Sequence, residues 1–258
     1  MQNLNVAVIQ SNLYWGDIDA NLKHHEVHVN QLEDQVDLIL LPEMFSTGFI
    51  MEPAKYAETE SGKAVTWMKA MAGKTNAVIG GSLIIEENHQ YFNRFMMVWP
   101  DRSTKHYDKR HLFRLANEQD VFTGGNERTI IELKGWSILL NVCYDLRFPV
   151  WARNQNDYDL MIYVANWPER RNLAWKTLLQ ARAIENQAYC IGVNRVGEDG
   201  KGINYSGDSS IIHPDGTILL QEAHNECVLE ANLSFEEIKD FRKQLPFHID
   251  KDQFKIKL

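Results

Sequence analysis

The sequence has 258 residues, which is long enough for one large α/β domain or two small ones. Hydrophobic residues make up 44% of it, enough to form a core. Its 27 lysines and arginines against 35 aspartates and glutamates give a net charge of -8, which argues against nucleic acid as a partner. No apolar run reaches about 18 residues, so we expect no membrane span and no membrane partner.

In the first half of the chain, the spacing of apolar residues predicts two helices and five strands. The helices cover residues 17–32 and 61–74. Asp17 or Asp19 is predicted to cap the first helix, and Ser61 the second. The strands cover residues 4–10, 37–41, 77–86, 91–99 and 103–107. Gly80 and Gly81, side by side in the third strand, are expected to let another segment of backbone approach closely.

The first predicted helix carries His24 and His28 four residues apart, so both side chains lie on one face and could in principle share a metal ion. No carboxylate-rich motif accompanies the pair in the sequence, and polar helix faces are usually solvated. We therefore expect no metal site, and nothing in the sequence indicates a cofactor.

The second half of the chain is predicted to contain seven strands and three helices. The strands cover residues 128–133, 136–142, 159–165, 189–196, 208–213, 217–221 and 226–231. The helices cover residues 148–152, 172–186 and 234–245. Ser234 and Glu237 form a Ser-x-x-Glu signature that predicts a capped start for the last helix. Residues 197–207 are rich in glycine and are predicted to form a loop.

The order of these elements predicts one α/β domain. Strands and helices are interspersed along the whole length, which implies sheets with helices on their outer faces. No internal repeat, low-complexity segment or linker divides the chain. We therefore expect a single domain over residues 1–258, with a C-terminal tail over residues 246–258.

The cysteines and the N-terminus indicate a reducing compartment. Cys143, Cys190 and Cys227 are odd in number and far apart, so neither a disulfide framework nor a C-x-x-C zinc site is supported. The first ten residues, MQNLNVAVIQ, lack the basic region and long apolar segment of a signal peptide. We expect a cytoplasmic protein.

Cys143 lies where the apolar run of residues 137–142 ends and a helix is predicted to begin. A side chain at such a sharp turn can project into a pocket, with backbone N–H groups facing a developing anion. Taken alone, an unpaired cysteine is more often a small buried hydrophobe. Asp145 and Arg147, just beyond, are expected to organise the turn through an ion pair or backbone hydrogen bonds rather than to contact substrate.

Two other stretches favour a catalytic cysteine. Residues 37–43, DLILLPE, form an apolar strand that ends in the carboxylate of Glu43. Residues 105–111, KHYDKRH, place Lys109 just after another predicted strand. A glutamate, a lysine and Cys143 at the ends of apolar runs could converge on one edge of a sheet.

Three motifs in this order resemble the nitrilase, or carbon-nitrogen hydrolase, superfamily. The motifs are LPE at residues 41–43, YDKRHLF at 107–113 and NVCYDLRFP at 141–149. The resemblance extends from Val6 to about Leu233. ANWPERR at residues 165–171 and ARAIENQAYCIGVNRVG at 181–197 are similar to the omega-amidase branch. The resemblance implies a four-layer α-β-β-α sandwich, a fold that periodicity alone does not predict.

The resemblance also implies a catalytic triad of Glu43, Lys109 and Cys143. Glu43 would accept the thiol proton, and Lys109 would favour the thiolate and, with the backbone N–H of Tyr144, stabilise an oxyanion. Glu118 corresponds to the second glutamate of the family and would position the amide or Lys109. A solvent-facing loop residue is the alternative for Glu118.

The implied substrate is the terminal amide of a small 2-oxo dicarboxylic acid, such as 2-oxoglutaramate or 2-oxosuccinamate, cleaved to the acid and ammonia through a cysteine thioester. Arg170 or Arg171 is expected to bind its remote carboxylate, since a guanidinium is a bidentate partner for such a group; otherwise the pair caps the following helix. The expected substrate-binding residues are Phe45, Asn166, Trp167, Arg170 and Arg171.

Other functions remain open at this point. The superfamily also includes nitrilases, N-carbamoyl hydrolases and acyltransferases, and the motifs do not separate these activities. A cysteine protease arrangement would use His106 or His111, which flank the lysine. A non-catalytic scaffold would keep the fold without turnover. Relatives usually form dimers, so we expect a homodimer, to which aromatic segments near Trp151, Trp167 and residues 247–254 could contribute unless those aromatics are core.

Overall fold

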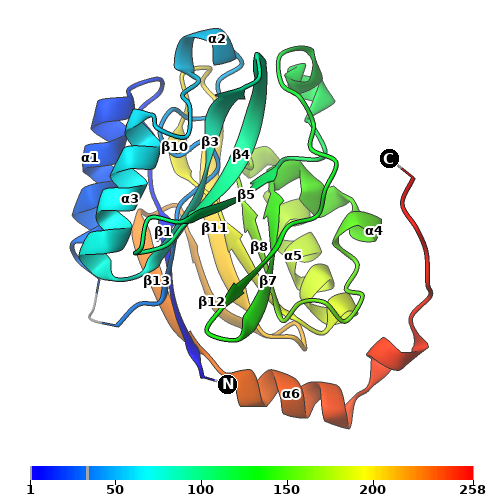
Figure 1. Cartoon of the computed structure of the whole chain (residues 1–258). Coiled ribbons are helices and arrows are strands. Elements are labelled where there is room, and N and C mark those ends of the chain that lie inside the picture. The colour runs from blue at the N-terminus through cyan, green and yellow to red at the C-terminus, as the bar shows by residue number, and fades with distance from the viewer. Residues whose placement is uncertain (1, 33–34, 258) are drawn as a thin grey trace.

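Two β-sheets packed face to face form the centre of the molecule (Figure 1). The computed structural model describes residues 2–32 and 35–257, so the ends of the predicted domain, residues 1 and 258, and residues 33–34 lie outside the described residues. None of the helices in the described part of the chain is long and apolar enough to cross a membrane.

The first sheet has six strands in the order β13-β1-β2-β3-β4-β5. These are β1 (Leu4–Gln10), β2 (Leu38–Leu40), β3 (Val78–Glu87), β4 (Gln90–Val98), β5 (Thr104–Asp108) and β13 (Cys227–Leu233). Strands β1, β2 and β3 run parallel to one another, so β1 and β2 deliver the chain to the same edge of the sheet. The predicted strands of this half agree with the structure to within two residues at each end.

The second sheet runs β10-β11-β9-β8-β7-β6, with β12 paired to β11. Its strands are β6 (Ile130–Leu133), β7 (Trp136–Val142), β8 (Leu160–Val164), β9 (Tyr189–Val193), β10 (Val196–Glu198), β11 (Asn204–Ile212) and β12 (Ile218–Ala223). Strands β7, β8 and β9 are parallel and apolar except for Ser137, Asn141 and Gly192, as expected for strands buried on both faces.

Helices cover the outer faces of both sheets and complete four layers (Figure 1). On the first sheet lie α1 (Ile18–Val29) and α3 (Lys63–Thr75), and on the second α5 (Asn172–Asn186) and the short α4 (Pro149–Ala152). The predicted α-β-β-α sandwich is therefore confirmed. The short α2 (Pro53–Tyr56) was not predicted, and α6 (Phe235–Gln244) follows β13.

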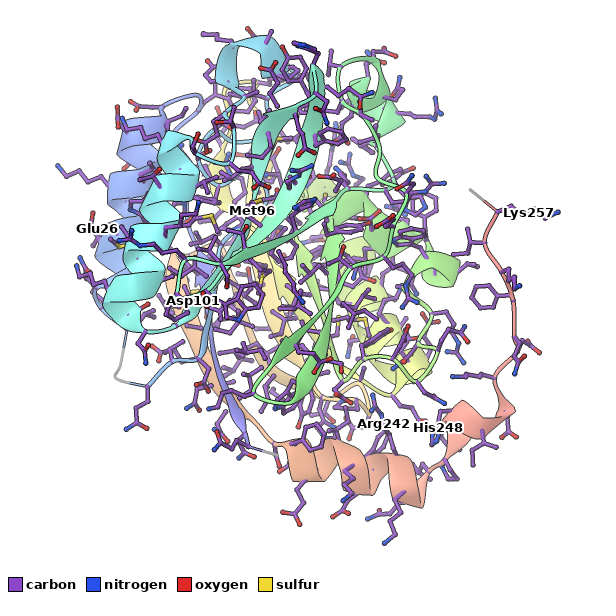
Figure 2. All side chains as sticks on the ribbon, viewed as in Figure 1. Glu26, Met96, Asp101, Arg242, His248 and Lys257 are labelled. Atoms are coloured by element: carbon purple, nitrogen blue, oxygen red, sulfur yellow. The ribbon has the colours of Figure 1, made fainter. Side chains whose placement is uncertain are left out.

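The core lies between the sheets and under the helices. One continuous cluster of buried side chains contains Val6, Leu40 and Phe95 of the first sheet together with Leu140 and Ile162 of the second. A second cluster joins α1 and α3 to the outer face of the first sheet. Figure 2 shows the side chains that fill these layers, with Met96 inside and Glu26 on the outer surface of α1.

Gly81 and Gly192 allow close packing against β3 and β9. A Cβ atom at Gly81 would lie 2.9 Å from Leu41 Cβ and from Phe45 Cδ1, so side chains approach β3 closely where the sequence predicted an approach of backbone. At Gly192 a Cβ atom would lie 2.4 Å from Leu179 Cδ1, and its absence lets α5 pack directly on β9. Both contacts are too short for any residue with a Cβ atom.

The helix caps agree with the sequence in two of three cases. Asp17 accepts a hydrogen bond from the Ala20 N–H, and Ser234 accepts one from the Glu237 N–H. The prediction for Ser61 was wrong, because α3 begins after Gly62 and the side chain of Glu58 accepts from the Ala64 N–H at 2.8 Å. A carboxylate six residues upstream therefore takes the place of the local hydroxyl.

The predicted glycine-rich loop at residues 197–207 was wrong. Residues 196–198 and 204–206 pair as antiparallel strands in β10 and β11. The turn between them is held by Asp199, whose carboxylate accepts hydrogen bonds from the Lys201 and Ile203 N–H groups and from the Tyr205 hydroxyl. Polar residues in this hairpin hid the strand pattern in the sequence.

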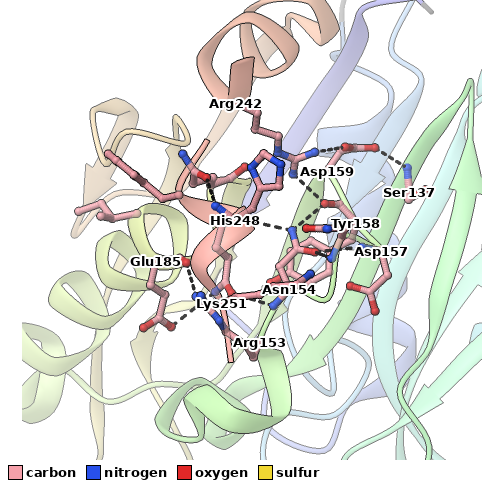
Figure 3. A pocket seen from close by; sticks show the side chains of 15 residues that line it. Ser137, Arg153, Asn154, Asp157, Tyr158, Asp159, Glu185, Arg242, His248 and Lys251 are labelled. Carbon is pink, nitrogen blue, oxygen red and sulfur yellow. Dashed lines mark hydrogen bonds and ion pairs between the residues drawn. The ribbon is translucent and has the colours of Figure 1, made fainter. Parts of the chain in front are cut away.

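Helix α6 and the C-terminal segment after it are attached to the body by polar contacts. Arg242 donates to Asp159 Oδ1 at 2.6 Å and to the Tyr158 carbonyl at 2.8 Å, as Figure 3 shows. The exposed apolar side chains of this segment are Leu245, Phe247, Ile249, Phe254 and Ile256. Trp151 and Trp167, considered as possible surface aromatics, are buried instead.

Candidate active site

Glu43, Lys109 and Cys143 come from three strand ends and meet in the interior. Glu43 follows β2, Lys109 follows β5 and Cys143 follows β7. Lys109 Nζ lies 2.9 Å from Glu43 Oε1 and 2.9 Å from Glu118 Oε2. The charges of Glu43, Lys109 and Glu118 all act on the Cys143 thiol. The structure therefore brings the predicted triad and Glu118 together, and Glu118 is not a solvent-facing residue.

Hydrogen bonds to both carboxylate oxygens fix the orientation of Glu43. Asn93 Nδ2 donates to Oε1 at 2.7 Å, and the Asn166 N–H donates to Oε2 at 2.8 Å. Asn166 Nδ2 also donates to the Glu43 carbonyl at 2.5 Å. Ser82 Oγ donates in turn to Asn93 Oδ1 and so orients the amide that holds Glu43. Such outer contacts limit the side chain to one geometry.

Lys109 is a buried ammonium between two carboxylates. Burial alone would lower the pKa of Lys109, but the charges of Glu118 and Glu43 raise it overall, so the side chain stays protonated. Burial raises the pKa of Glu118, and the nearby Lys109 opposes that shift. Glu118 Oε2 also accepts a hydrogen bond from the Phe113 N–H at 2.6 Å, so Glu118 connects Lys109 to the backbone of Phe113.

Cys143 occupies a strained turn at the end of β7. Its φ is +45°, a left-handed conformation that is costly for a residue with a side chain and often marks functional sites. Burial raises the pKa of the Cys143 thiol well above its ordinary value. The charge of Glu43 adds to the shift, while Lys109 acts in the opposite direction. Lys109 therefore favours the thiolate, as expected, but burial and Glu43 outweigh it, so the sulfur of Cys143 carries a proton before the reaction.

Asp145 organises the turn through partners other than the expected arginine. Its Oδ2 accepts from the Val142 N–H at 3.0 Å and from the Tyr107 hydroxyl at 2.8 Å. Its Oδ1 accepts from the His111 N–H at 3.0 Å and lies 2.7 Å from His111 Nδ1. Of the two predicted alternatives, Asp145 makes the backbone hydrogen bonds, and among the described residues it forms no ion pair with Arg147.

The two histidines of the protease alternative are engaged elsewhere. His111 stacks on Phe148 with ring centroids 3.7 Å apart and keeps Asp145 as its polar partner. His106 lies at the surface 3.6 Å from the Glu60 carboxylate. The charged groups around the thiol are Glu43, Lys109 and Glu118, so the geometry favours the glutamate and lysine arrangement.

A cavity of about 240 Å³ opens beside Cys143, and its size suits a small molecule. Four of the five expected substrate-binding residues line it, namely Asn166, Trp167, Arg170 and Arg171. The prediction for Phe45 was wrong, because its ring is buried against His25 and Trp67 under α1 and α3. Other lining residues are Phe49, Phe113, Leu115, Ala116, Tyr144, Arg147, Pro168, Asp199, Lys201, Ile203 and Tyr205.

Three arginines and a lysine line the cavity. Arg171 lies over the Phe113 ring at 5.1 Å, and Arg147 lies over the Trp167 ring at 5.0 Å. Burial lowers the pKa of Arg171, and the charge of Arg170 lowers it further. Within residues 2–32 and 35–257, no carboxylate forms an ion pair with Arg147, Arg170, Arg171 or Lys201. The cavity can therefore receive an anion.

Several residues of the site were missed in the sequence. Asn93 interrupts an apolar strand. Arg147 was expected only to organise the turn, but it also lines the cavity. A polar residue inside an apolar strand is the available signal for Asn93, since a buried amide needs partners. Lys201 and Tyr205 belong to the hairpin that was expected to be a loop, and no sequence pattern points to them.

Comparisons with known proteins agree with this geometry. The profile of the family described as carbon-nitrogen hydrolase matches residues 5–243. Omega-amidase YafV of Escherichia coli (strain K12) is 46% identical over 99% of this chain and 100% of that protein. The 2-oxoglutaramate amidase of Bacillus subtilis (strain 168) is 29% identical over 95% of this chain and 96% of that one.

A solved structure is similar over its entire length. XC1258 from Xanthomonas campestris, described as a CN-hydrolase superfamily protein with an arsenic adduct in the active site, is 39% identical. It superposes with a TM-score of 0.98 and covers 100% of both chains. The protein described here therefore belongs to the carbon-nitrogen hydrolase family of the nitrilase superfamily. Within that family it is an amide-hydrolysing enzyme of the omega-amidase-like branch, as its motifs predicted.

Proposed function

We propose that this enzyme is an omega-amidase that hydrolyses the terminal amide of a small 2-oxo dicarboxylic acid, of the 2-oxoglutaramate or 2-oxosuccinamate type, to the acid and ammonia. The observation that carries the proposal is the 46% identity to an omega-amidase over the full length of both chains. The buried triad and a cavity with unpaired cations support it, since the substrate combines an amide with a remote carboxylate.

In the first step, the sulfur of Cys143 attacks the amide carbonyl. The raised pKa of the thiol means that Glu43 accepts its proton during the attack rather than before it. The carbonyl oxygen becomes an oxyanion, which the Lys109 ammonium and the Tyr144 N–H stabilise. Because Lys109 is held by two carboxylates, its position is set before the substrate binds.

In the second step, the tetrahedral intermediate breaks its carbon-nitrogen bond. Glu43 gives the proton back to the leaving nitrogen, ammonia departs, and the acyl group remains on Cys143 as a thioester. A water molecule then attacks the thioester, and Glu43 accepts its proton. The carbon-sulfur bond breaks, the sulfur regains a proton and the free acid leaves.

The substrate carboxylate is the natural partner of the cations in the cavity. Arg171 is the stronger candidate of the predicted pair, because it is half-buried beside Phe113 whereas Arg170 is exposed. Partial burial strengthens a charge-assisted hydrogen bond. Arg147, over Trp167, is a second guanidinium within the same cavity.

Ammonia release from a panel of small compounds tests the proposal. We expect 2-oxoglutaramate and 2-oxosuccinamate to be turned over with a higher kcat/KM than a neutral amide of equal length, a nitrile or an N-carbamoyl amino acid. A preference for the nitrile or the N-carbamoyl compound would contradict the omega-amidase assignment while leaving the family intact. No ammonia from any compound would favour the scaffold.

We also propose a single-domain homodimer in the cytoplasm. The core cluster that spans both sheets supports one domain. The exposed Phe247, Ile249 and Phe254 of the C-terminal segment are apolar surface that a second copy could cover. Three free cysteines fit a reducing compartment. Light scattering of the full chain and of a Phe247→Ser, Ile249→Ser variant tests the dimer.

A further inference from the structure

A cluster of two histidines and a glutamate lies apart from the residues of the candidate active site. His24 and His28 are on α1, and Glu226 precedes β13, so residues about 200 positions apart in the chain meet. His24 Nε2 lies 3.1 Å from Glu226 Oε2, and His28 Nε2 lies 3.7 Å from the same oxygen. One ligand atom from each of the three residues lies within 4.8 Å of the others.

The local structure sets this arrangement. His24 and His28 occupy positions i and i+4 of α1, so their rings project from the same side of the helix, with centroids 4.9 Å apart. The backbone N–H of Asn12 donates to Glu226 Oε1 at 2.9 Å and holds the carboxylate toward the rings. The Tyr14 ring contacts the edge of His24 at 5.5 Å and limits its rotation.

One atom of the cluster makes no hydrogen bond to the residues that the structure describes. His28 Nε2 is buried and makes no hydrogen bond in the structure. Buried ring nitrogens are normally satisfied, so an orphaned one facing a carboxylate points to a missing ligand. An imidazole binds a metal ion through a ring nitrogen whose lone pair no hydrogen bond occupies.

We propose that His24, His28 and Glu226 bind a divalent metal ion of the Zn²⁺ class. Two imidazole nitrogens and one carboxylate oxygen are ligands that Zn²⁺ prefers, whereas Mg²⁺ and Ca²⁺ prefer an all-oxygen set. Ligand atoms around tetrahedral Zn²⁺ lie about 3.3 Å apart, so the cluster needs only small side-chain rotations to close around the ion. The partial exposure of Glu226 leaves room for water as the fourth ligand.

The ion would connect two distant parts of the fold. It would join α1 to the loop before β13, the strand that pairs with β1 along its whole length. The same helix carries Asn21 and His25, which bind the carbonyls of Ser46 and Phe45 just after Glu43. Metal binding is thus expected to stabilise the fold, because an ion that binds only the native state shifts the unfolding equilibrium.

Metal titration of the full-length enzyme, first dialysed against a chelator, tests the site. The probes are Zn²⁺, measured by competition with a chromophoric chelator, and Co²⁺, measured by its visible absorption. We expect one ion per chain, a Co²⁺ spectrum of a tetrahedral site and a higher Tm with Zn²⁺. His28→Ala and Glu226→Gln are expected to weaken Zn²⁺ binding by at least about tenfold and to remove the Tm increase.

His89→Ala is the matched control, since His89 is exposed on the turn between β3 and β4 and lies outside the cluster. It is expected to bind Zn²⁺ as the wild type does. Retained ammonia release will show that each variant is folded, because none of these side chains contacts the candidate active site. Equal Zn²⁺ affinity in His28→Ala, Glu226→Gln and the wild type would overturn the proposal, as would the absence of any stoichiometric binding.

Discussion

The ammonium of Lys109 lies 2.9 Å from Glu43 Oε1, and both side chains are fully buried. Glu118 lies on the other side of the same ammonium, so the three ionised groups carry a net charge of about -1 in a region without solvent. Removing either carboxylate leaves a neutral pair, whereas removing the lysine leaves two facing carboxylates. The consequences for stability and for turnover are therefore different.

We predict that Glu43→Gln separates turnover from stability. Loss of the general base lowers kcat by about a hundredfold or more, while Glu118 still neutralises Lys109 and the free energy of unfolding falls by only about 1 kcal/mol. Lys109→Met leaves two uncompensated carboxylates and lowers the free energy of unfolding by about 3 kcal/mol or more. Ammonia release and urea denaturation measure both effects. Equal loss of stability in the two variants would contradict this charge balance.

Asp145→Asn is predicted to damage the turn that holds Cys143. The carboxylate accepts N–H or O–H groups on both oxygens, and an amide would turn one acceptor into a donor facing another donor. We expect the free energy of unfolding to fall by about 2 kcal/mol and kcat to fall more than KM rises. The exposed Asp240→Asn is the control. An Asp145→Asn enzyme with unchanged kcat would show that this network does not position the cysteine.

Arg171→Ala is predicted to change the choice of substrate. Loss of a charge-assisted hydrogen bond to the remote carboxylate should raise KM for 2-oxoglutaramate by about tenfold to a hundredfold. KM for a neutral amide of similar length should change little. Steady-state kinetics with both substrates measure the split, with Arg102→Ala, on the turn before β5, as a surface control. A similar rise in KM for the two substrates would reject the carboxylate clamp.

The buried His25 is predicted to make the free energy of unfolding depend on pH. Burial lowers its pKa to about 3, opposed by the hydrogen bond to the Phe45 carbonyl. The unfolded chain binds a proton near pH 6.5 while the folded chain does not, so this contribution is complete above that pH and is lost as the pH falls. We expect His25→Gln to remove about 2 kcal/mol of the difference in the free energy of unfolding between pH 7 and pH 5.

Urea denaturation at both pH values, in the presence of a chelator, measures the His25 contribution. His89→Gln serves as the control, because this exposed histidine should leave the pH dependence unchanged. If His25→Gln loses as much stability on acidification as the wild type does, the buried imidazole takes up its proton without cost and the expected linkage is absent.

Much of the fold could be predicted because its strands and long helices carry strong local patterns. Helix α5 was predicted with the bounds that the structure has, and Ser234 and Asp17 are caps that hydrogen bond locally. Glu43 and Cys143 each follow an apolar strand, whereas Lys109 follows the largely polar β5; all three lie in family motifs. Their meeting in space follows from the strand order of the two sheets, and the family resemblance had implied the triad.

The remaining features depend on contacts between distant residues. Phe45 and Phe49 are four residues apart, and only the packing of α1 and α3 decides that the first ring enters the core and the second the cavity wall. The sequence showed no carboxylate-rich motif with His24 and His28, so the cluster now proposed as a metal site could not be found from it. The pairing of β13 with β1 supplies Glu226 from the other end of the chain.

The most direct test of the central claim is hydroxamate formation from 2-oxoglutaramate in the presence of hydroxylamine. If the acyl group passes through a thioester on Cys143, hydroxylamine will intercept it, so the wild-type enzyme will form hydroxamate together with ammonia. Cys143→Ala will form neither product. Ammonia release by Cys143→Ala at the wild-type rate, or wild-type turnover that never yields hydroxamate, would contradict the account.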